Sequence, residues 1–191
     1  MPTSLSKTFG QNGRLRVAVG MSGGVDSAVS ALLLKQSGKY EVTGVFMKNW
    51  DTLEESGGDC QADKEAADAE RICNHIGVPF RHVNFVKEYW SEVFEPTLET
   101  YTRGQTPFPD VDCNRHIKFG HFHDYCTEQL GCDMVATGHY ARVDHSSGPT
   151  SQLLRAVDRC GHKRSYFSVC LSSSLKRRSF DFKVTRTSPW N

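Results

Sequence analysis

A glycine-rich segment near the start of the chain has a composition suited to phosphate binding. It runs Gly20-Met-Ser-Gly-Gly-Val-Asp-Ser27, between a short apolar run and a run rich in Ala and Leu. Its glycines let the backbone approach an anion and adopt turns that are closed to larger residues. The N–H groups at the start of a following helix, together with the two serine hydroxyls, would then surround a phosphate. The candidate nucleotide-binding residues of this segment are Gly20, Met21, Ser22, Gly23, Gly24, Val25, Asp26 and Ser27.

Two other uses of this segment are open. Asp26, beside bound phosphates, is a candidate ligand for Mg²⁺, which favours carboxylate and phosphate oxygens. The plainer alternative is a tight strand-to-helix turn in which Asp26 or Ser27 caps the helix. The segment has neither the Gly-Lys-Ser/Thr ending of a Walker A loop nor the GxGxxG spacing of a dinucleotide site. Both of those classes are therefore disfavoured.

A second segment carries a thiol. Cys113 lies in the proline-containing stretch from Arg103 to Asn114, which is expected to be a loop, and a helix is expected from Arg115. A thiol near a helix N-terminus and a cation has its nucleophilic thiolate form favoured. Asp110 could accept a proton or hold the loop, although its negative charge opposes thiolate formation. The alternative is a buried, inert cysteine, which is the common state of this residue.

The elements that must position these two segments alternate between strands and helices. Apolar and β-branched runs predict strands at Leu15–Val19, Glu41–Phe46, Phe80–Val86, Asp133–Thr137 and Gln152–Val157. Helical spacing predicts helices at Ser27–Ser37, Gln61–Ile76, Lys87–Tyr101 and Arg115–Leu130. Pro96 is expected to kink or divide the third helix. The alternation predicts an α/β fold with an open, mostly parallel sheet and helices on both faces. The glycine-rich segment then lies at the carboxyl end of a strand, where such sheets bind ligands.

Composition limits the class of protein. A chain of 191 residues allows one α/β domain, or one domain with a short appendage. With 38% hydrophobic and 24% charged residues, it is neither a disordered tail nor a membrane protein. The net charge of +1 means that a nucleic-acid partner requires a local basic patch. Seven cysteines without a CxxC pair argue against a secreted disulfide scaffold and against a structural zinc site.

Longer motifs carry a resemblance to a known family. Ser22-Gly-Gly-Val-Asp-Ser27 after an apolar strand resembles the PP-loop of the ATP pyrophosphatases, which cleave ATP to AMP and pyrophosphate. Phe46-Met-Lys-Asn-Trp50 and Pro109-Asp-Val-Asp-Cys-Asn114 narrow it to the tRNA-uridine 2-sulfurtransferases, and so does Ala136-Thr-Gly-His-Tyr-Ala-Arg142. The order and spacing match from about residue 15 to residue 157. The resemblance implies a Rossmann-like PP-loop fold and ATP-dependent 2-thiolation of the tRNA wobble uridine.

The resemblance also implies roles for single residues in the cysteine segment. Cys113 corresponds to the catalytic nucleophile of a sulfur-transfer pair, with Asp110 in the same catalytic segment. Phe108, Pro109 and Asp110 correspond to the residues that touch the target base. Phe108 departs from the family pattern, which usually has Asn there. A ring at this position could stack on a base, but an amide hydrogen bond is lost.

For the nucleotide, the resemblance implies two contacts outside the glycine-rich segment. Met47 corresponds to a residue beside the adenine, and Gly138 to a second nucleotide contact. On periodicity alone, sheet packing is the favoured interpretation of Met47, and a strand-end turn is the plainer interpretation of Gly138. The implied small molecules are ATP and Mg²⁺, and the implied partners are tRNA and a sulfur-donor protein that carries a persulfide. No membrane is expected, and a mitochondrial location is preferred over a cytoplasmic one because the N-terminal residues lack acids.

Other conspicuous residues have plainer interpretations. Tyr89 and Trp90 are expected to be core or helix-packing residues. His116, His121 and His123 are expected to be helix-surface or satisfied polar groups. His139 and Arg142 are candidates for phosphate contacts, or equally for surface polarity.

The resemblance divides the chain into an N-terminal extension (1–14), a PP-loop ATP pyrophosphatase domain (15–158) and a divergent basic tail (159–191). The family's second catalytic cysteine, which carries the persulfide and forms a disulfide with the first, lies beyond the residues matched. The chain is therefore expected to be C-terminally truncated and incomplete by itself. One alternative is a non-catalytic fragment that binds ATP and tRNA. Another is a PP-loop synthetase or amidotransferase that adenylates a small acid and has no use for Cys113.

Overall fold

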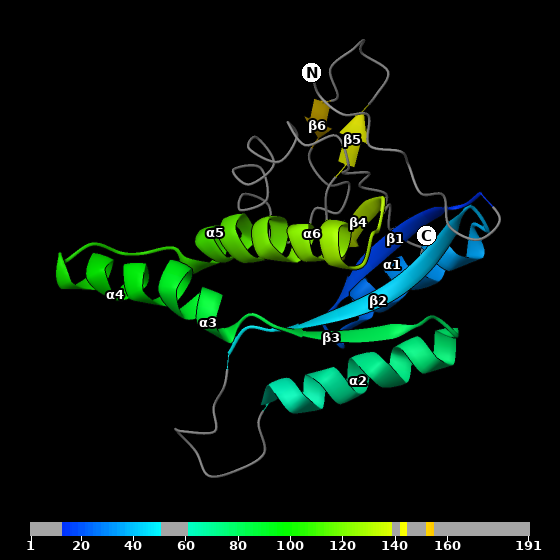
Figure 1. Cartoon of the computed structure of the whole chain (residues 1–191). Coiled ribbons are helices and arrows are strands. Elements are labelled where there is room, and N and C mark those ends of the chain that lie inside the picture. Colours follow the sequence, from blue (N-terminus) through cyan, green and yellow to red (C-terminus); the bar gives the residue numbers. More distant parts are fainter. Residues whose placement is uncertain (1–12, 51–60, 139–141, 145–151, 155–191) are drawn as a thin grey trace, which may run out of the picture.

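The computed structural model describes residues 13–50, 61–138, 142–144 and 152–154. The first two ranges form a parallel sheet between helices (Figure 1). The sheet has four strands in the order β3-β2-β1-β4. They are β1 (Leu15–Met21), β2 (Tyr40–Lys48), β3 (Phe80–Asn84) and β4 (Met134–Thr137). All three strand pairs are parallel. This arrangement confirms the α/β fold that the sequence predicts.

One face of the sheet is covered by α1 (Val25–Gln36) and α2 (Gln61–Ile76). Alternate residues of the central strand, Val17, Val19 and Met21, are buried against this pair together with Ala31 and Cys73. Side chains on a strand alternate between the two faces, so this set of positions follows from the pleat of the sheet. Helix α2 has the bounds that the sequence predicts.

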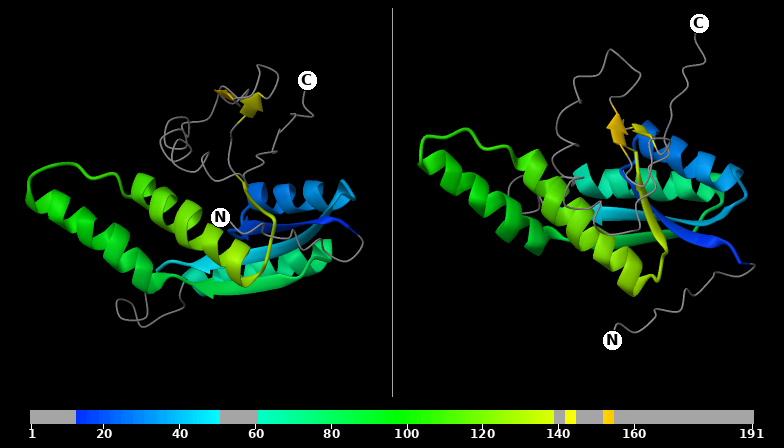
Figure 2. Two further views of the ribbon diagram at one scale, coloured as in Figure 1. Left: turned by 45° about the horizontal axis from the view of Figure 1, so that its top comes forward. Right: turned by 90° about the horizontal axis from the view of Figure 1, so that it is seen from above.

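The other face is covered by two helices that run side by side, 86–102 and 109–129. The first consists of α3 (Val86–Tyr89), the π-helical segment η1 (Trp90–Phe94) and α4 (Glu95–Thr102). The second consists of α5 (Pro109–Asp112), η2 (Cys113–His121), α6 (Phe122–Asp124) and η3 (Tyr125–Gln129). Ala18 and Val45 of the sheet pack against Val93, Ile117 and Phe122 of these helices. Helices therefore cover both faces, as predicted, and Figure 2 shows the pair extending past the sheet.

The structure decides how two prolines are used. Pro96 does not divide helix 86–102: wide π-helical turns over Trp90–Phe94 precede it and accommodate a residue without an N–H. Pro109 begins a helix rather than belonging to a loop, so helix 109–129 starts before Cys113 and not at Arg115. Proline suits the first helical position, where its missing N–H has no partner to lose.

The remaining described residues form a separate ribbon. Strand β5 (Arg142–Asp144) pairs antiparallel with β6 (Gln152–Leu154), so the fifth predicted strand exists but lies outside the main sheet. Strand β3 is shorter than predicted, because Asn84 turns the chain: its side-chain oxygen accepts a hydrogen bond from the Val86 N–H at 2.9 Å. None of the helices in the described ranges is both long and apolar enough to cross a membrane.

Candidate functional site at the carboxyl ends of the strands

The glycine-rich loop joins the carboxyl end of β1 to α1, and its backbone is held without a side-chain cap. Helix α1 begins at Val25, with Gly24 as the N-cap and no side-chain hydrogen bond to the cap. The first bond within the helix runs from the Ala28 N–H to the Gly24 carbonyl at 3.2 Å. The N–H groups before Ala28 therefore have no acceptor within the helix, which is the arrangement that binds anions. Asp26 and Ser27 lie inside the first turn, so the predicted alternative in which one of them caps the helix is wrong.

Gly23 fixes where this loop rests. Its φ is +73°, in the left-handed region that favours glycine. A Cβ at this position would lie 2.9 Å from the Glu65 carbonyl oxygen and 3.3 Å from the Asp68 Cβ, both on α2. The loop therefore lies directly on the N-terminal half of α2, with no room for a side chain between them.

The two serines of the loop bond to the loop itself. The Ser27 hydroxyl is buried; it donates to the Gly24 carbonyl at 3.0 Å and accepts from the Ser22 N–H at 3.2 Å. The two hydroxyl oxygens lie 3.2 Å apart. Ser22 is exposed, so its hydroxyl lies at the open side of the loop. In this structure Ser27 holds the shape of the loop, and the backbone with Ser22 is what faces solvent.

Gly138 and Met47 lie on either side of this loop. Gly138 follows β4, and a Cβ there would lie 2.7 Å from the Ser27 nitrogen, so the end of β4 packs against the start of α1 without intervening atoms. Met47 lies near the end of β2, and a Cβ on Gly20 would be 3.6 Å from its Cε. The structure thus brings both predicted nucleotide contacts to the loop. Position 138 therefore requires glycine because a side chain would collide with the start of α1, and not only because the chain turns there.

Cys113 lies at the same end of the sheet as the loop. Helix 109–129 runs antiparallel to β1: a Cβ on Gly131, just after the helix, would meet the Arg16 side chain, and a Cβ on Gly20 would meet the Phe122 ring at 3.4 Å. Cys113 therefore lies beyond the carboxyl end of β1, nine residues before Phe122 along this helix. The thiol is partly exposed.

Tyr89 and Asp110 lie beside this thiol. Burial raises the pKa of Tyr89, and the negative charges of ionised Cys113 and Asp110 raise it further. Tyr89 also contacts Trp50 edge-on, with ring centroids 6.0 Å apart. From the sequence Tyr89 is predicted only as a packing residue, and its position beside Cys113 is not predicted. No local signal marks it, because Tyr89 and Cys113 come together only when the two helices pack.

The remaining cysteines of the described residues differ from Cys113 in being buried. Burial raises the pKa values of Cys73, Cys126 and Cys132. Their thiols are therefore held in the protonated, unreactive form. Within the part of the chain that the structure describes, Cys113 is the cysteine with access to solvent.

Phe108 and Pro109 lead into the cysteine helix. Pro109 is its first residue, and Phe108, just before it, exposes 42% of its surface. Asp110 and Asp112 lie in the first turn, where the negative charge of a carboxylate interacts favourably with the helix dipole. The predicted base-contacting segment is thus the N-terminal turn of a helix, with one aromatic side chain directed to solvent.

Asp26 is the candidate ligand for Mg²⁺. It lies in the first turn of α1, partly exposed. The described residues hold no group of three or more His, Cys, Asp or Glu side chains arranged for a metal ion. Nucleotide-bound Mg²⁺ usually takes only one or two carboxylates from the protein and its other ligands from phosphates and water. Asp26 therefore fits an Mg²⁺ ion that is bound together with a nucleotide, and not one held by protein ligands alone.

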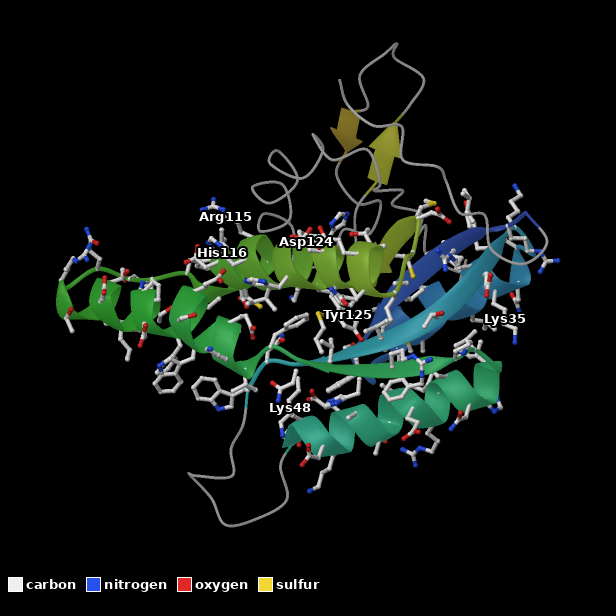
Figure 3. The ribbon with its side chains drawn as sticks, in the orientation of Figure 1. Lys35, Lys48, Arg115, His116, Asp124 and Tyr125 are labelled. Carbon is white, nitrogen blue, oxygen red and sulfur yellow. The ribbon has the colours of Figure 1, made fainter. Side chains whose placement is uncertain are left out.

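The three histidines of helix 109–129 have polar partners, as predicted. The His121 Nε2 lies 2.7 Å from Glu92, and the His116 Nδ1 lies 3.4 Å from the other oxygen of the same carboxylate. His123 is buried and lies 3.2 Å from Asp124. Figure 3 shows His116 and Arg115 near the start of this helix. His139 and residues 159–191 lie outside the described residues, as does the side chain of Arg142.

Comparison with known proteins gives a family. Residues 15–186 match the family model described as the tRNA methyl transferase HUP domain. A chicken protein named mitochondrial tRNA-specific 2-thiouridylase 1 is 58% identical over 128 residues, which are 67% of this chain and 30% of that protein. The tRNA-specific 2-thiouridylase MnmA of Lactiplantibacillus plantarum is 50% identical over 165 residues, or 86% of this chain and 43% of that protein. The chain therefore spans less than half the length of these relatives.

A solved structure from Methanocaldococcus jannaschii agrees with this family at the level of the fold. It is described as a predicted subunit of tRNA methyltransferase, and it covers 93% of this chain and 71% of its own with a TM-score of 0.50 and 17% identity. At that identity the likeness concerns the fold and not the chemistry. The glycine-rich loop of this chain lies within the residues that the family model matches.

Proposed function

Because the chain belongs to the family of the tRNA methyl transferase HUP domain, we propose that it is the adenylating domain of a tRNA-uridine 2-sulfurtransferase. The observation that supports this most is a coincidence of position. A glycine-rich loop with uncapped N–H groups and a partly exposed cysteine lie at the same end of one parallel sheet. An enzyme that activates a base with ATP and then transfers sulfur to it needs both groups at one cavity.

In this proposal the triphosphate of ATP lies on the loop 22–27, where backbone N–H groups bind its oxygens. Met47 packs beside the adenine and Gly138 lets the nucleotide approach the start of α1. Asp26 holds Mg²⁺, which would neutralise charge on the phosphates. The same fixed dipoles stabilise the charge that moves onto the departing pyrophosphate.

The base then reacts in two steps. The C2 oxygen of the wobble uridine attacks the α-phosphorus of ATP, so that pyrophosphate leaves and the oxygen becomes a good leaving group. A persulfide sulfur next bonds to C2 and AMP departs, while Cys113 takes the persulfide's remaining sulfur atom into a disulfide or assists the transfer. Phe108, Pro109 and Asp110 hold the base, with the exposed Phe108 ring as a stacking surface.

Further parts of the proposal rest on the relatives. The chicken relative is named mitochondrial, which supports a mitochondrial location, with a cytoplasmic location as the alternative. For a mitochondrial enzyme the proposed substrate is a taurinomethyl-modified uridine. The persulfide comes from a sulfur-donor protein. The division into a PP-loop ATP pyrophosphatase domain (15–158) and a divergent basic tail (159–191) comes from the sequence motifs, whereas the family model matches on to residue 186.

The test separates the two half-reactions. The 191-residue chain is incubated with ATP, Mg²⁺, a tRNA transcript and sulfide, and AMP release and 2-thiouridine are measured independently. tRNA-dependent AMP release, with or without 2-thiouridine, supports an adenylating domain. ATP and tRNA binding with no AMP release supports the rival function, a non-catalytic binding fragment.

A third outcome distinguishes another class of enzyme. If AMP appears with a small carboxylic acid in place of tRNA, and Cys113→Ser releases it at the same rate, the chain is a PP-loop synthetase. Such an enzyme has no use for a thiol, so the sulfurtransferase proposal would be wrong.

A further inference from the structure

Asn114, the residue after Cys113, is a buried amide whose oxygen has no hydrogen-bond partner. The residue exposes 5% of its surface, and its Oδ1 is buried without a donor. Leaving a buried acceptor unpaired costs folding free energy, so native proteins pair nearly all such groups. An unpaired acceptor next to a partly exposed thiol therefore points to a donor that arrives with a ligand.

The helix places this amide between the apolar core and the segment proposed to hold the base. Ile117, about one turn further on, is fully buried in the core between the sheet and helix 109–129. Asp110, about one turn before Asn114, is exposed. Arg115, the next residue along the chain, is exposed on the outer side of the helix (Figure 3). Asn114 is thus the buried polar side chain below the proposed base-contacting residues Phe108, Pro109 and Asp110.

The other unpaired buried atoms of the described residues indicate what kind of ligand this is. They are the Asn49 Oδ1 and the Arg16 Nε. Asn49 directly follows β2, so both unpaired acceptors lie at the carboxyl ends of the strands, whereas Arg16 lies near the start of β1. An ionised phosphate offers no hydrogen to an acceptor, but a nucleobase carries N–H donors. Unpaired acceptors at this end of the sheet therefore suit a base.

Two bases take part in the proposed reaction, the adenine of ATP and the target uracil. Uracil has one ring N–H, at N3, between the carbonyl groups at C2 and C4. A side-chain amide can pair with that edge, because its oxygen accepts from N3–H while its nitrogen donates to a neighbouring carbonyl. Sulfur is transferred to C2, next to N3, and Asn114 adjoins the cysteine proposed to act in that transfer. The position therefore favours uracil over adenine.

We propose that Asn114 binds the target uracil and accepts a hydrogen bond from its N3–H. This inference rests on the proposed function and adds a base-binding residue to it. Transfer of the adenylyl group to the C2 oxygen places positive charge on the uracil ring, which makes N3–H a stronger donor. The hydrogen bond is then stronger in the activated base than in the free one, so it contributes to the reaction as well as to binding.

A purely structural role predicts the opposite change in stability. If Asn114 held the helix in place, Asn114→Leu would lower the free energy of unfolding. If its oxygen stays unpaired until a base binds, leucine of similar shape removes an unsatisfied group, and the free energy of unfolding is expected to stay the same or rise. Chemical denaturation of the full 191-residue chain measures this quantity. A lower value would mean that Asn114 is a structural residue.

The binding experiment uses anticodon stem-loops that carry uridine or N3-methyluridine at the target position. Filter binding measures their affinities for the full 191-residue chain. The unsubstituted chain is expected to bind the methylated stem-loop about threefold to tenfold more weakly, because the N–H donor is lost. In Asn114→Leu, the uridine stem-loop is expected to bind more weakly by a similar factor, and methylation is expected to change its affinity less than about twofold. Asn114→Ala serves if the leucine variant does not fold.

Thr127→Val is the matched control on the same helix. The Thr127 hydroxyl has a partner, because it donates to the His123 carbonyl at 2.9 Å. Its removal is expected to keep the ratio of the two affinities within about twofold of that of the unsubstituted chain.

The outcomes separate the Asn114 assignment from the proposed function. An unchanged affinity ratio in Asn114→Leu, or a loss of ATP affinity in place of stem-loop affinity, overturns the assignment of Asn114 alone. The same holds if the unsubstituted chain binds both stem-loops equally well. Failure of the unsubstituted chain to bind either stem-loop overturns the tRNA site and the Asn114 assignment together.

Discussion

The glycine-rich loop and the cysteine segment lie at the same end of the sheet, but the loop offers mainly backbone groups and the cysteine segment offers side chains. The loop presents backbone: Gly23 has a left-handed φ, Gly24 caps α1 without a side chain, and Ser27 bonds inward. The cysteine segment presents side chains, with a thiol and a carboxylate near Tyr89. A site for phosphate can be assembled from main-chain dipoles, whereas a nucleophile has to be one particular atom.

Replacing the nucleophile is expected to have the largest effect. Cys113→Ser removes the thiol while keeping a side chain of similar size, so the 2-thiouridine that the unsubstituted chain forms with sulfide is expected to fall below detection. The affinity for ATP should stay within about twofold, because the loop does not contain this residue. Mass spectrometry of digested tRNA gives the first quantity and calorimetry the second. A parallel loss of ATP affinity would show that the two regions are not separable.

Adding one methyl group to the loop is expected to be the next largest change. In Gly23→Ala, the Cβ meets the Glu65 carbonyl at 2.9 Å and the residue keeps an unfavourable φ, so the loop must move away from α2. ATP affinity is expected to fall at least about tenfold, with a loss of about 1–3 kcal/mol in the free energy of unfolding.

Gly104 supplies the matched control for that variant. It also has a φ of +73°, but nothing lies within 4 Å of a Cβ placed there. Gly104→Ala should cost comparable backbone strain in chemical denaturation while leaving ATP affinity unchanged. Equal loss of ATP affinity in both variants would contradict the role of the Gly23 contact with α2.

Replacing Phe108 tests whether the cysteine segment binds tRNA through its side chains, and a smaller effect is expected. Its ring is 42% exposed, so Phe108→Ala should lower the unfolding free energy by only about 1–2 kcal/mol, the part that its buried surface contributes. If the ring stacks on a base, tRNA affinity is expected to fall by about 1–3 kcal/mol, with ATP affinity unchanged. Filter binding with an anticodon stem-loop measures this. Phe108→Asn, with the residue usual in the family, separates stacking from an amide hydrogen bond.

The smallest expected effect is a change in the titration of Tyr89. Because ionised Cys113 and Asp110 raise the pKa of this phenol, removing either negative charge should lower it. In spectrophotometric titrations, the Tyr89 midpoint is assigned from the difference between the unsubstituted chain and Tyr89→Phe. This midpoint should move to lower pH in Cys113→Ser and in Asp110→Asn. Cys126→Ala, which removes a buried thiol elsewhere, should leave the midpoint in place. An unmoved midpoint in Cys113→Ser would mean that the thiol does not lie beside Tyr89.

The loop was predictable from the sequence because its determinants are local. An apolar strand, three glycines and a helix-forming run are consecutive, and each acts on the backbone of its own neighbours. Even here the start of α1 was predicted two residues late, since Asp26 and Ser27 are favourable caps in isolation. In the structure Gly24 is the cap, and the residue before it, Gly23, rests on α2.

The cysteine segment was predictable in identity but not in structure. A proline marks a loop and a first helical turn equally well, so Pro109 was assigned to a loop and the helix was started too late. Tyr89 had no signal, because its neighbours Asp110 and Cys113 come from an element distant in the chain.

By itself, the sequence determined the order of strands and helices, the parallel sheet and the position of a glycine-rich turn at a strand end. These depend on periodicity and on backbone freedom, which neighbouring residues settle among themselves. Only the tertiary structure decided that Gly138 touches the start of α1 and that Tyr89 lies beside Cys113. Such contacts join distant parts of the chain, and they exist only after the helices have packed on the two faces of the sheet.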